Sequence, residues 1–188
     1  MVVRYGGHCM RRIALVIAGI MVFGARAAAS HAETGKAVIR GTSEGSTVRG
    51  EAVVRETPEG LNVSVRITGA PPGMHGFHVH ALGSCDDHGN AAGGHFNPDG
   101  VAHGFLPKDG LVKAHAGDFG NLQVGPDGQG SLDLTLPGLS LSAGKYGVDG
   151  RAVILHENAD DFGQPTGNAG SRIGCGIIEV SQSLNRNE

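Results

Sequence analysis

Residues 76–118 read GFHVHALGSCDDHGNAAGGHFNPDGVAHGFLPKDGLVKAHAGD. This stretch holds six of the ten histidines of the chain, together with Asp118 and one of the three cysteines. Glycine, asparagine, aspartate and proline dominate its middle, a composition typical of loops. Imidazoles gathered on a loop and closed by a carboxylate form a ligand set typical of transition-metal sites. The stretch therefore predicts a metal site.

The run GFHVH at its start indicates a strand that carries two metal ligands. His78 and His80 are two residues apart, so on a strand both side chains point to the same face. Phe77 and Val79 then point to the opposite face, into a core. Two imidazoles from one strand form a rigid half-site for copper or zinc.

The loop supplies further ligands. Three imidazoles and one carboxylate suit a tetrahedral, closed zinc site, and the candidates are His95, His103, His115 and Asp118. The two strand histidines and one further strand histidine suit copper, with one histidine shared between the metals. The alternative is a set of unrelated histidines, each hydrogen-bonded as an ordinary polar residue.

The rest of the chain predicts an all-β fold. Its hydrophobic residues alternate in short segments separated by glycine-rich turns, and no helical period follows the first 32 residues. This pattern favours an antiparallel sandwich or barrel of Greek-key type in one domain. The eight predicted strands are 36–40, 47–55, 61–67, 75–80, 121–124, 131–136, 152–156 and 176–180. Two long connections, about 81–120 and 157–174, are expected to be functional.

Residues 1–32 are interpreted as a signal peptide. Arg4, Arg11 and Arg12 precede the apolar run 13–23, which is too short for a membrane anchor, and small residues near position 32 offer a cleavage site. An uncleaved anchor is the alternative, and the start codon could correspond to Met1 or Met10. We expect export to the periplasm or the extracellular space, without a membrane anchor in the mature form.

Cleavage after Ala32 leaves one domain, 33–188, with a net charge of −7, because the removed segment holds four of the fifteen basic residues and none of the eighteen acidic ones. A negative body argues against nucleic acid as a partner. Any anionic substrate must then be attracted locally. Cys85 and Cys175 remain as a pair, and an oxidising compartment favours a disulfide over two free thiols.

Five segments together resemble copper/zinc superoxide dismutase. They are GFHVHALGSCD (76–86), GGHFNPDGVAHG (93–104), HAGDFGN (115–121), GRAVILHENADD (150–161) and GNAGSRIGCGII (167–178). The likeness extends from about Lys36 to Val180 and suggests an exported, bacterial-type member.

The resemblance implies an eight-stranded Greek-key sandwich or barrel of immunoglobulin-like architecture. It implies copper and zinc as cofactors, with His95 as a bridging imidazolate. The implied copper ligands are His78, His80, His95 and His156, and the implied zinc ligands are His95, His103, His115 and Asp118.

The resemblance also implies roles beyond the ligands. Arg172 matches the arginine that guides superoxide to copper, and Asp160 matches a carboxylate that links a copper ligand, here His78, to a zinc ligand, here His103. Cys85 and Cys175 match an intrasubunit disulfide. His75 is expected to be a buried structural histidine and His88 a solvated one. The segment 157–171 is shorter than in familiar members and lacks lysine, so Arg172 is the one steering residue carried over.

The implied activity is dismutation of superoxide to dioxygen and hydrogen peroxide by a redox-cycling copper, with a structural zinc. A copper carrier without turnover and a zinc hydrolase built on the two strand histidines are the competing functions. The complete ligand set argues against the carrier, and the lack of a spare general base argues against the hydrolase. Family members occur as homodimers and as monomers, and the sequence leaves that choice open.

Overall fold

The computed structural model describes residues 1–3, 33–142 and 144–181. Most of the expected signal peptide, residues 4–32, lies outside the described residues. All the described strands belong to the compact unit His31–Glu188. None of the helices in the described residues is long and apolar enough to cross a membrane.

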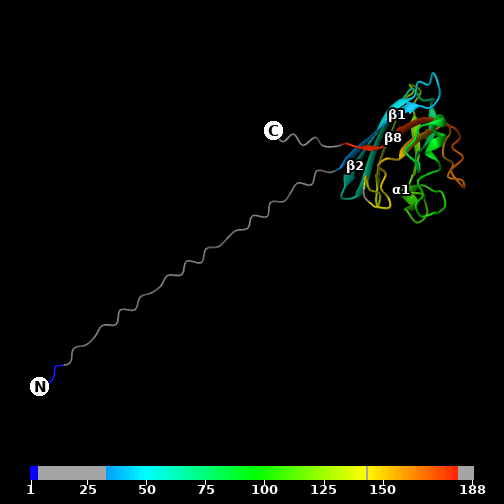
Figure 1. Ribbon diagram of the computed structural model, residues 1–188. Helices are drawn as coiled ribbons and strands as arrows, with labels where there is room; N and C mark the ends of the chain where they lie inside the picture. The colour runs from blue at the N-terminus through cyan, green and yellow to red at the C-terminus, as the bar shows by residue number, and fades with distance from the viewer. Residues whose placement is uncertain (4–32, 143, 182–188) are drawn as a thin grey trace, which may run out of the picture. The chain divides into compact units, whose positions relative to one another are not determined.

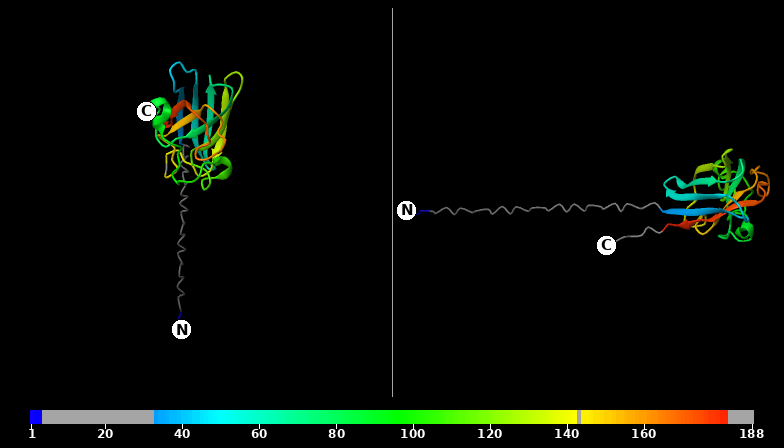
Figure 2. Two further views of the ribbon diagram at one scale, coloured as in Figure 1. Left: turned by 90° about the vertical axis from the view of Figure 1, so that its right-hand side faces the viewer. Right: turned by 90° about the horizontal axis from the view of Figure 1, so that it is seen from above.

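Eight antiparallel strands close into a barrel, as the sequence predicts (Figures 1 and 2). Their order around the barrel is β2-β3-β6-β5-β4-β7-β8-β1, and β1 pairs with β2 to close the ring. A ninth strand of two residues pairs with Gly35 and Lys36, near the N-terminal end of β1. The strands are β1 (Thr34–Gly41), β2 (Arg49–Thr57), β3 (Gly60–Thr68), β4 (Gly73–Val79), β5 (Asp118–Val124), β6 (Gly130–Leu136), β7 (Ala152–His156), β8 (Arg172–Ile177) and β9 (Glu179–Val180).

Side-chain alternation builds the barrel interior. On β3 the inward positions Leu61, Val63, Val65 and Ile67 are fully buried, while the residues between them face outward. The same two-residue period places Ala37 and Ile39 of β1 in the core. An antiparallel sheet with one apolar and one polar face closes in this way because closure covers the apolar face and removes both free edges.

The Greek-key crossing places β4 and β7 side by side. β4 lies between β5 and β7, although 72 residues separate the end of β4 from the start of β7 in the chain. Phe77 pairs with Leu155, and His78 pairs with Ile154. The two long connections leave from these strands and lie outside the barrel, coloured green and orange in Figures 1 and 2.

The predicted element boundaries need correction at both long connections. The first connection ends before Asp118, which begins β5, and it contains a 3₁₀ segment (η1, Asp87–Ala92) and a four-residue helix (α1, Leu106–Asp109) that no periodicity indicated. The second ends before Arg172, because β8 begins there and not at residue 176. The start of this strand lacks a hydrophobic alternation because glycine occupies a core position. At Gly174 an added Cβ would lie 3.2 Å from Ile39, so the neighbouring strand packs directly against the backbone.

Candidate metal centre

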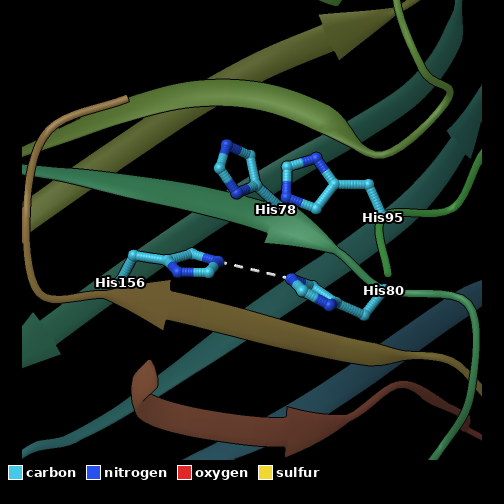
Figure 3. Close-up of side chains that lie close together, drawn as sticks. All are labelled: His78, His80, His95 and His156. Carbon is cyan, nitrogen blue, oxygen red and sulfur yellow. Dashed lines mark hydrogen bonds between the residues drawn. The ribbon is translucent and has the colours of Figure 1, made fainter. Parts of the chain in front are cut away.

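Seven side chains meet in two overlapping clusters outside the barrel wall. The first consists of four buried histidines whose rings face one another (Figure 3), and the second of three histidines and one aspartate. In each cluster one ligand atom per residue lies within 4.8 Å of all the others. The first cluster is His78, His80, His95 and His156, and the second is His95, His103, His115 and Asp118.

The pair His80 and His156 shows why the first cluster fits a cation. The Nδ1 of His80 lies 2.9 Å from the carbonyl of Gly93, and the Nδ1 of His156 lies 3.2 Å from that of Gly170. A carbonyl only accepts, so Nδ1 carries the proton in both neutral rings. The two Nε2 atoms, 3.3 Å apart, then face each other with lone pairs. A metal ion between them satisfies both.

Burial keeps these rings neutral. It lowers the pKa of His80 to about 2 and that of His156 to about 3. Burial also lowers the pKa of His95 to about 4, although its hydrogen bond with Asp118 opposes the shift. Metal ligation requires the unprotonated nitrogen, so the three rings are ready to bind a metal at neutral pH.

The roles of the ring nitrogens of His78 and His95 can be assigned in the same way. The Nε2 of His78 donates to Asp160 at 2.8 Å, and its Nδ1 is buried without a hydrogen-bond partner. The Nδ1 of His95 lies 2.8 Å from Asp118 in the second cluster. Its other nitrogen is left for the first cluster, where the ring centroid lies 4.1 Å from that of His78. His95 can therefore serve both clusters at once.

The second cluster has the spacing of a tetrahedral site. The Nδ1 atoms of His103 and His115 lie 2.9 and 3.1 Å from Asp118 oxygens, yet neither makes a hydrogen bond. Ligands about 2.0 Å from zinc lie about 3.3 Å apart in a tetrahedron. Backbone amides of Gly104 and His115 fix one Asp118 oxygen, at 3.0 and 2.8 Å.

Asp160 links the two clusters. Its carboxylate accepts from Nε2 of His78 at 2.8 Å and from Nε2 of His103 at 2.9 Å. The hydrogen bonds with these histidines outweigh burial and hold the pKa of Asp160 below its usual range. A carboxylate in this position fixes the tautomer and direction of a ligand ring. The two clusters fit two metal ions. Their buried ring nitrogens lack hydrogen-bond partners, and their potential ligand atoms already face a common centre.

Arg172 lies at the entrance to the first cluster. Its guanidinium donates to the carbonyls of Gly89 and Gly93, at 2.5 and 2.6 Å. A cleft of about 300 Å³ is lined by Arg172 together with His80, His95 and His156. Both donors are tied to the loop that carries His95, so the positive charge has a fixed place at the mouth.

Comparison with known proteins identifies the family. A family model described as copper/zinc superoxide dismutase matches residues 48–178. The chain belongs to the copper/zinc superoxide dismutase family. It is thus an oxidoreductase of the superoxide dismutase type, with copper and zinc as cofactors.

Individual relatives agree with the family model over most of their length. A protein named superoxide dismutase [Cu-Zn] 2 from Brassica juncea is 42% identical over 153 residues, covering 77% of this chain and 97% of the relative. One of the same name from Mesembryanthemum crystallinum is 40% identical over 156 residues, covering 79% and 96%. A crystal structure of the clock protein EA4 is 39% identical with a TM-score of 0.70, covering 79% of this chain and 94% of that one.

A disulfide ties the dismutase's metal loop to the barrel. Cys85 and Cys175 are bonded, with a Cα–Cα distance of 5.7 Å. The bond joins the loop ahead of η1 to β8, three residues after Arg172. It therefore connects the segment that carries His95 to the strand that carries the arginine.

The structure separates the two remaining described histidines from the metal clusters. His75 is 2% exposed, and its ring nitrogens each lie 2.8 Å from a carbonyl, those of Pro71 and His156. The structural role predicted for His75 is confirmed. His88 is exposed, as expected, and one ring nitrogen lies 2.9 Å from the Thr42 carbonyl.

Sequence reasoning missed three residues that hold the site. Arg151 lies over the Phe96 ring at 3.6 Å and donates to the carbonyl of Ala81 at 2.6 Å, next to two candidate ligands. The side chains of Asn121 and Gln164 bond to the backbone of Asp160 and His103. Their partners lie 39 to 70 residues away, and no periodicity or motif marks them.

Proposed function

We propose that this dismutase converts superoxide to dioxygen and hydrogen peroxide at a copper ion bridged to a structural zinc. The proposed ligands are His78, His80, His95 and His156 for copper, and His95, His103, His115 and Asp118 for zinc. The observation that carries the proposal is the pair of facing lone pairs on His80 and His156, which opens to a cleft beside a fixed guanidinium.

The two metals have different parts. Copper, when bound, supplies the one-electron redox change that dismutation requires, while zinc has no redox change and holds its ligands in place. The cleft is lined by His80 and His156 of the first cluster and by the shared His95, but not by His103, His115 or Asp118. This asymmetry supports copper in the first cluster and zinc in the second.

His95 is proposed to hold and pass on a proton. Its ring lies between the clusters, and the nitrogen that faces the first cluster is next to the cleft. A proton held at that nitrogen lies where the peroxide product leaves. The other nitrogen, at 2.8 Å from Asp118, fixes the ring plane during the transfer.

Arg172 is proposed to bind the substrate anion. The mature chain has a net charge of −7, so long-range attraction of superoxide is weak. Segment 157–171, which forms much of the cleft rim, contains no lysine. The fixed guanidinium beside the ligand rings is therefore the local charge that draws superoxide into the cleft.

Activity of residues 33–188 tests the function. The protein, with its disulfide formed and one copper and one zinc bound, is expected to dismutate superoxide rapidly, and His156→Ala is expected to lose that activity. A wild-type protein that binds both metals and does not turn over would indicate a copper carrier. Activity that survives in His156→Ala would contradict the copper ligand set.

We also propose that the chain is exported and that residues 1–32 are removed as a signal peptide. The disulfide supports this, because such bonds persist in oxidising compartments. Mass spectrometry of the mature protein is expected to find Glu33 at its N-terminus. An intact N-terminus in the purified protein would contradict export by this route. Homodimer formation is left to a measurement of mass in solution.

A further inference from the structure

The side chain of Gln164 forms a reciprocal pair with the backbone of His103. The backbone N–H of His103 donates to Oε1 at 3.0 Å, and Nε2 of Gln164 donates to the carbonyl of His103 at 2.8 Å. Two such bonds are what a neighbouring β-strand would supply. The carboxamide thus takes the place of a strand beside a residue that lies in a loop.

His103 has no other backbone support. It lies between η1 and α1, in a segment without secondary structure. Among the described residues, no main-chain group bonds to its backbone N–H or carbonyl. A buried backbone group without a partner is costly, so these two bonds fix where the main chain of His103 runs.

The segment 157–171 therefore holds both the ring and the backbone of His103. Asp160 fixes the ring through Nε2, and Gln164 fixes the backbone. The segment itself is anchored, because the side chain of Asn121 pairs with both backbone groups of Asp160 at 2.9 and 2.7 Å. The ring of Phe162 also lies 5.6 Å from that of Phe105, two residues after His103.

The copper-side ligands do not depend on Gln164. His80 and His156 are oriented by the carbonyls of Gly93 and Gly170, as described above. Neither carbonyl is a hydrogen-bond partner of the Gln164 carboxamide, which bonds to the backbone of His103. Loss of the carboxamide should thus disturb one metal more than the other.

We propose that Gln164 is a positioning residue for zinc, which sets how slowly the metal leaves by holding the backbone of His103. The inference rests on the zinc ligand set of the proposed function. With the backbone released, the ring of His103 can turn away from the metal while Asp160 still binds Nε2. The opening step of zinc loss then becomes easier, and the copper side keeps its own anchors.

The experiment compares metal release from the full, copper- and zinc-loaded protein. Gln164→Met keeps the length of the side chain and removes both hydrogen bonds. We expect zinc to transfer to a chromophoric chelator about ten-fold faster than from the wild type. Copper transfer to a copper chelator is expected to change little, because the carbonyls that orient His80 and His156 remain in place. Cobalt placed in the zinc site should show altered visible bands.

Gln123→Met is the matched control. Gln123 also donates from its carboxamide to main-chain carbonyls, those of Gly73 and Val124, at 3.2 and 3.0 Å. It lies exposed on β5 away from both clusters. Its loss is expected to leave both release rates and the cobalt bands unchanged.

Three results would overturn the inference. Equal zinc release from Gln164→Met and the wild type would remove the role of the carboxamide. Equal acceleration of zinc and copper would show a general loosening of the fold. A wild-type protein that retains copper and fails to retain zinc would contradict the zinc ligand set itself, which is a failure of the proposed function and is seen before any variant is made.

Discussion

At the scale of single residues, the fixed charge of Arg172 is proposed to govern access of the substrate. We expect Arg172→Ala to lower the dismutation rate constant by about ten-fold or more, since local charge raises association rates by that order. Metal content should stay near normal, because in the described part of the chain the guanidinium bonds to the carbonyls of Gly89 and Gly93 and to none of the seven candidate ligand side chains. Pulse radiolysis and metal analysis of the same samples measure both.

Arg172→Lys provides the comparison for that variant. Lysine keeps the charge and loses the two-point contact, so we expect a rate between those of the wild type and the alanine variant. Loss of both metals from Arg172→Ala would show that the arginine holds the loop and would contradict a steering role.

Gly167 is a second residue whose identity the site requires. Its φ is +77°, and a Cβ there would lie 1.8 Å from the Asp160 carboxylate and 2.7 Å from Nε2 of His103. Gly167→Ala must therefore push Asp160 away from His103. We expect zinc affinity to fall by about ten- to a hundred-fold, as for other losses of a carboxylate behind a ligand histidine. Competition with a zinc chelator measures it.

Gly45→Ala separates backbone strain from the loss of contact. Gly45 also has a positive φ, +74°, and no atom within 4 Å of the added Cβ. We expect it to cost some stability and to leave zinc affinity unchanged. Equal zinc affinity of the Gly167 and Gly45 variants would contradict the role given to Asp160.

The sequence is most informative about residues whose partners are near in the chain. His78 and His80 share a face because of a two-residue spacing, and the buried Phe77 and Val79 follow from the same period. Contacts between residues that are far apart in the chain could not be predicted in this way. Gln164 and Asn121 act on residues 61 and 39 positions away, and only the folded barrel brings them there.

At the scale of elements, the disulfide holds the metal loop against β8. The bond closes a separation of 90 residues. We expect the double variant Cys85→Ser/Cys175→Ser to lose about 4–5 kcal/mol of unfolding free energy in the chain-entropy model, because the open chain gains freedom when unfolded. Urea unfolding of the metal-free proteins measures the difference.

A reductant supplies the control for that prediction. The wild type unfolded with its disulfide reduced should behave like the serine variant, since both lack the cross-link. Equal urea midpoints for the variant and the oxidised wild type would show that the bond leaves the unfolded chain unconstrained and would contradict the expected loss.

Strands with clean alternation were predictable, whereas a strand packed against glycine was predicted with the wrong start. β3 was found from its four inward hydrophobic residues. β8 was predicted to begin four residues late, because Gly174 replaces a core side chain with close contact between strands. The late start placed Arg172 in a loop. The structure places it on a strand paired with His156, across an irregular register.

At the scale of the whole molecule, the barrel determines which distant segments meet. β4 and β7 become neighbours only through the Greek-key crossing, and that crossing brings His156 to His80. Local pattern predicted both strands and an all-β fold. The assignment of His156 to the same cluster as His78 and His80 came from the family resemblance, since no local signal distinguishes one antiparallel neighbour from another.

The buried histidines of the first cluster also determine how the metal-free molecule responds to pH. His80, His95 and His156 have pKa values lowered to about 2, 4 and 3, mainly by burial, against about 6.5 in the unfolded chain. Between those values the unfolded chain binds more protons than the folded one. The unfolding free energy should therefore fall as the pH drops from about 6.5 towards 4.

Asp118 and His103 complete the profile. Burial opposes ionisation of Asp118, but the surrounding histidines and the backbone amides that donate to its carboxylate lower its pKa, so its contribution is also lost in acid. His103 has the opposite sign. Burial lowers its pKa, yet the neighbouring carboxylates of Asp118 and Asp160 prevail and raise it to about 9, so its contribution is present below about 6.5 and is lost as the pH rises through 9.

The metal-free protein should accordingly be most stable near neutral pH. It should lose stability more steeply towards acid, where three histidines and the carboxylates act together, than towards base, where His103 alone of these groups loses its contribution. Urea unfolding of the oxidised, metal-free chain at pH 4.5, 6.5 and 9 measures the profile. Replacing His80 removes one of the histidines with a lowered pKa. The fall of the unfolding free energy towards acid pH should then become shallower, and the fall towards basic pH should stay unchanged. An acid side as shallow as the basic one in the wild type would mean that the cluster opens to water before it is protonated, and that the closed cluster of lone pairs does not persist without metal.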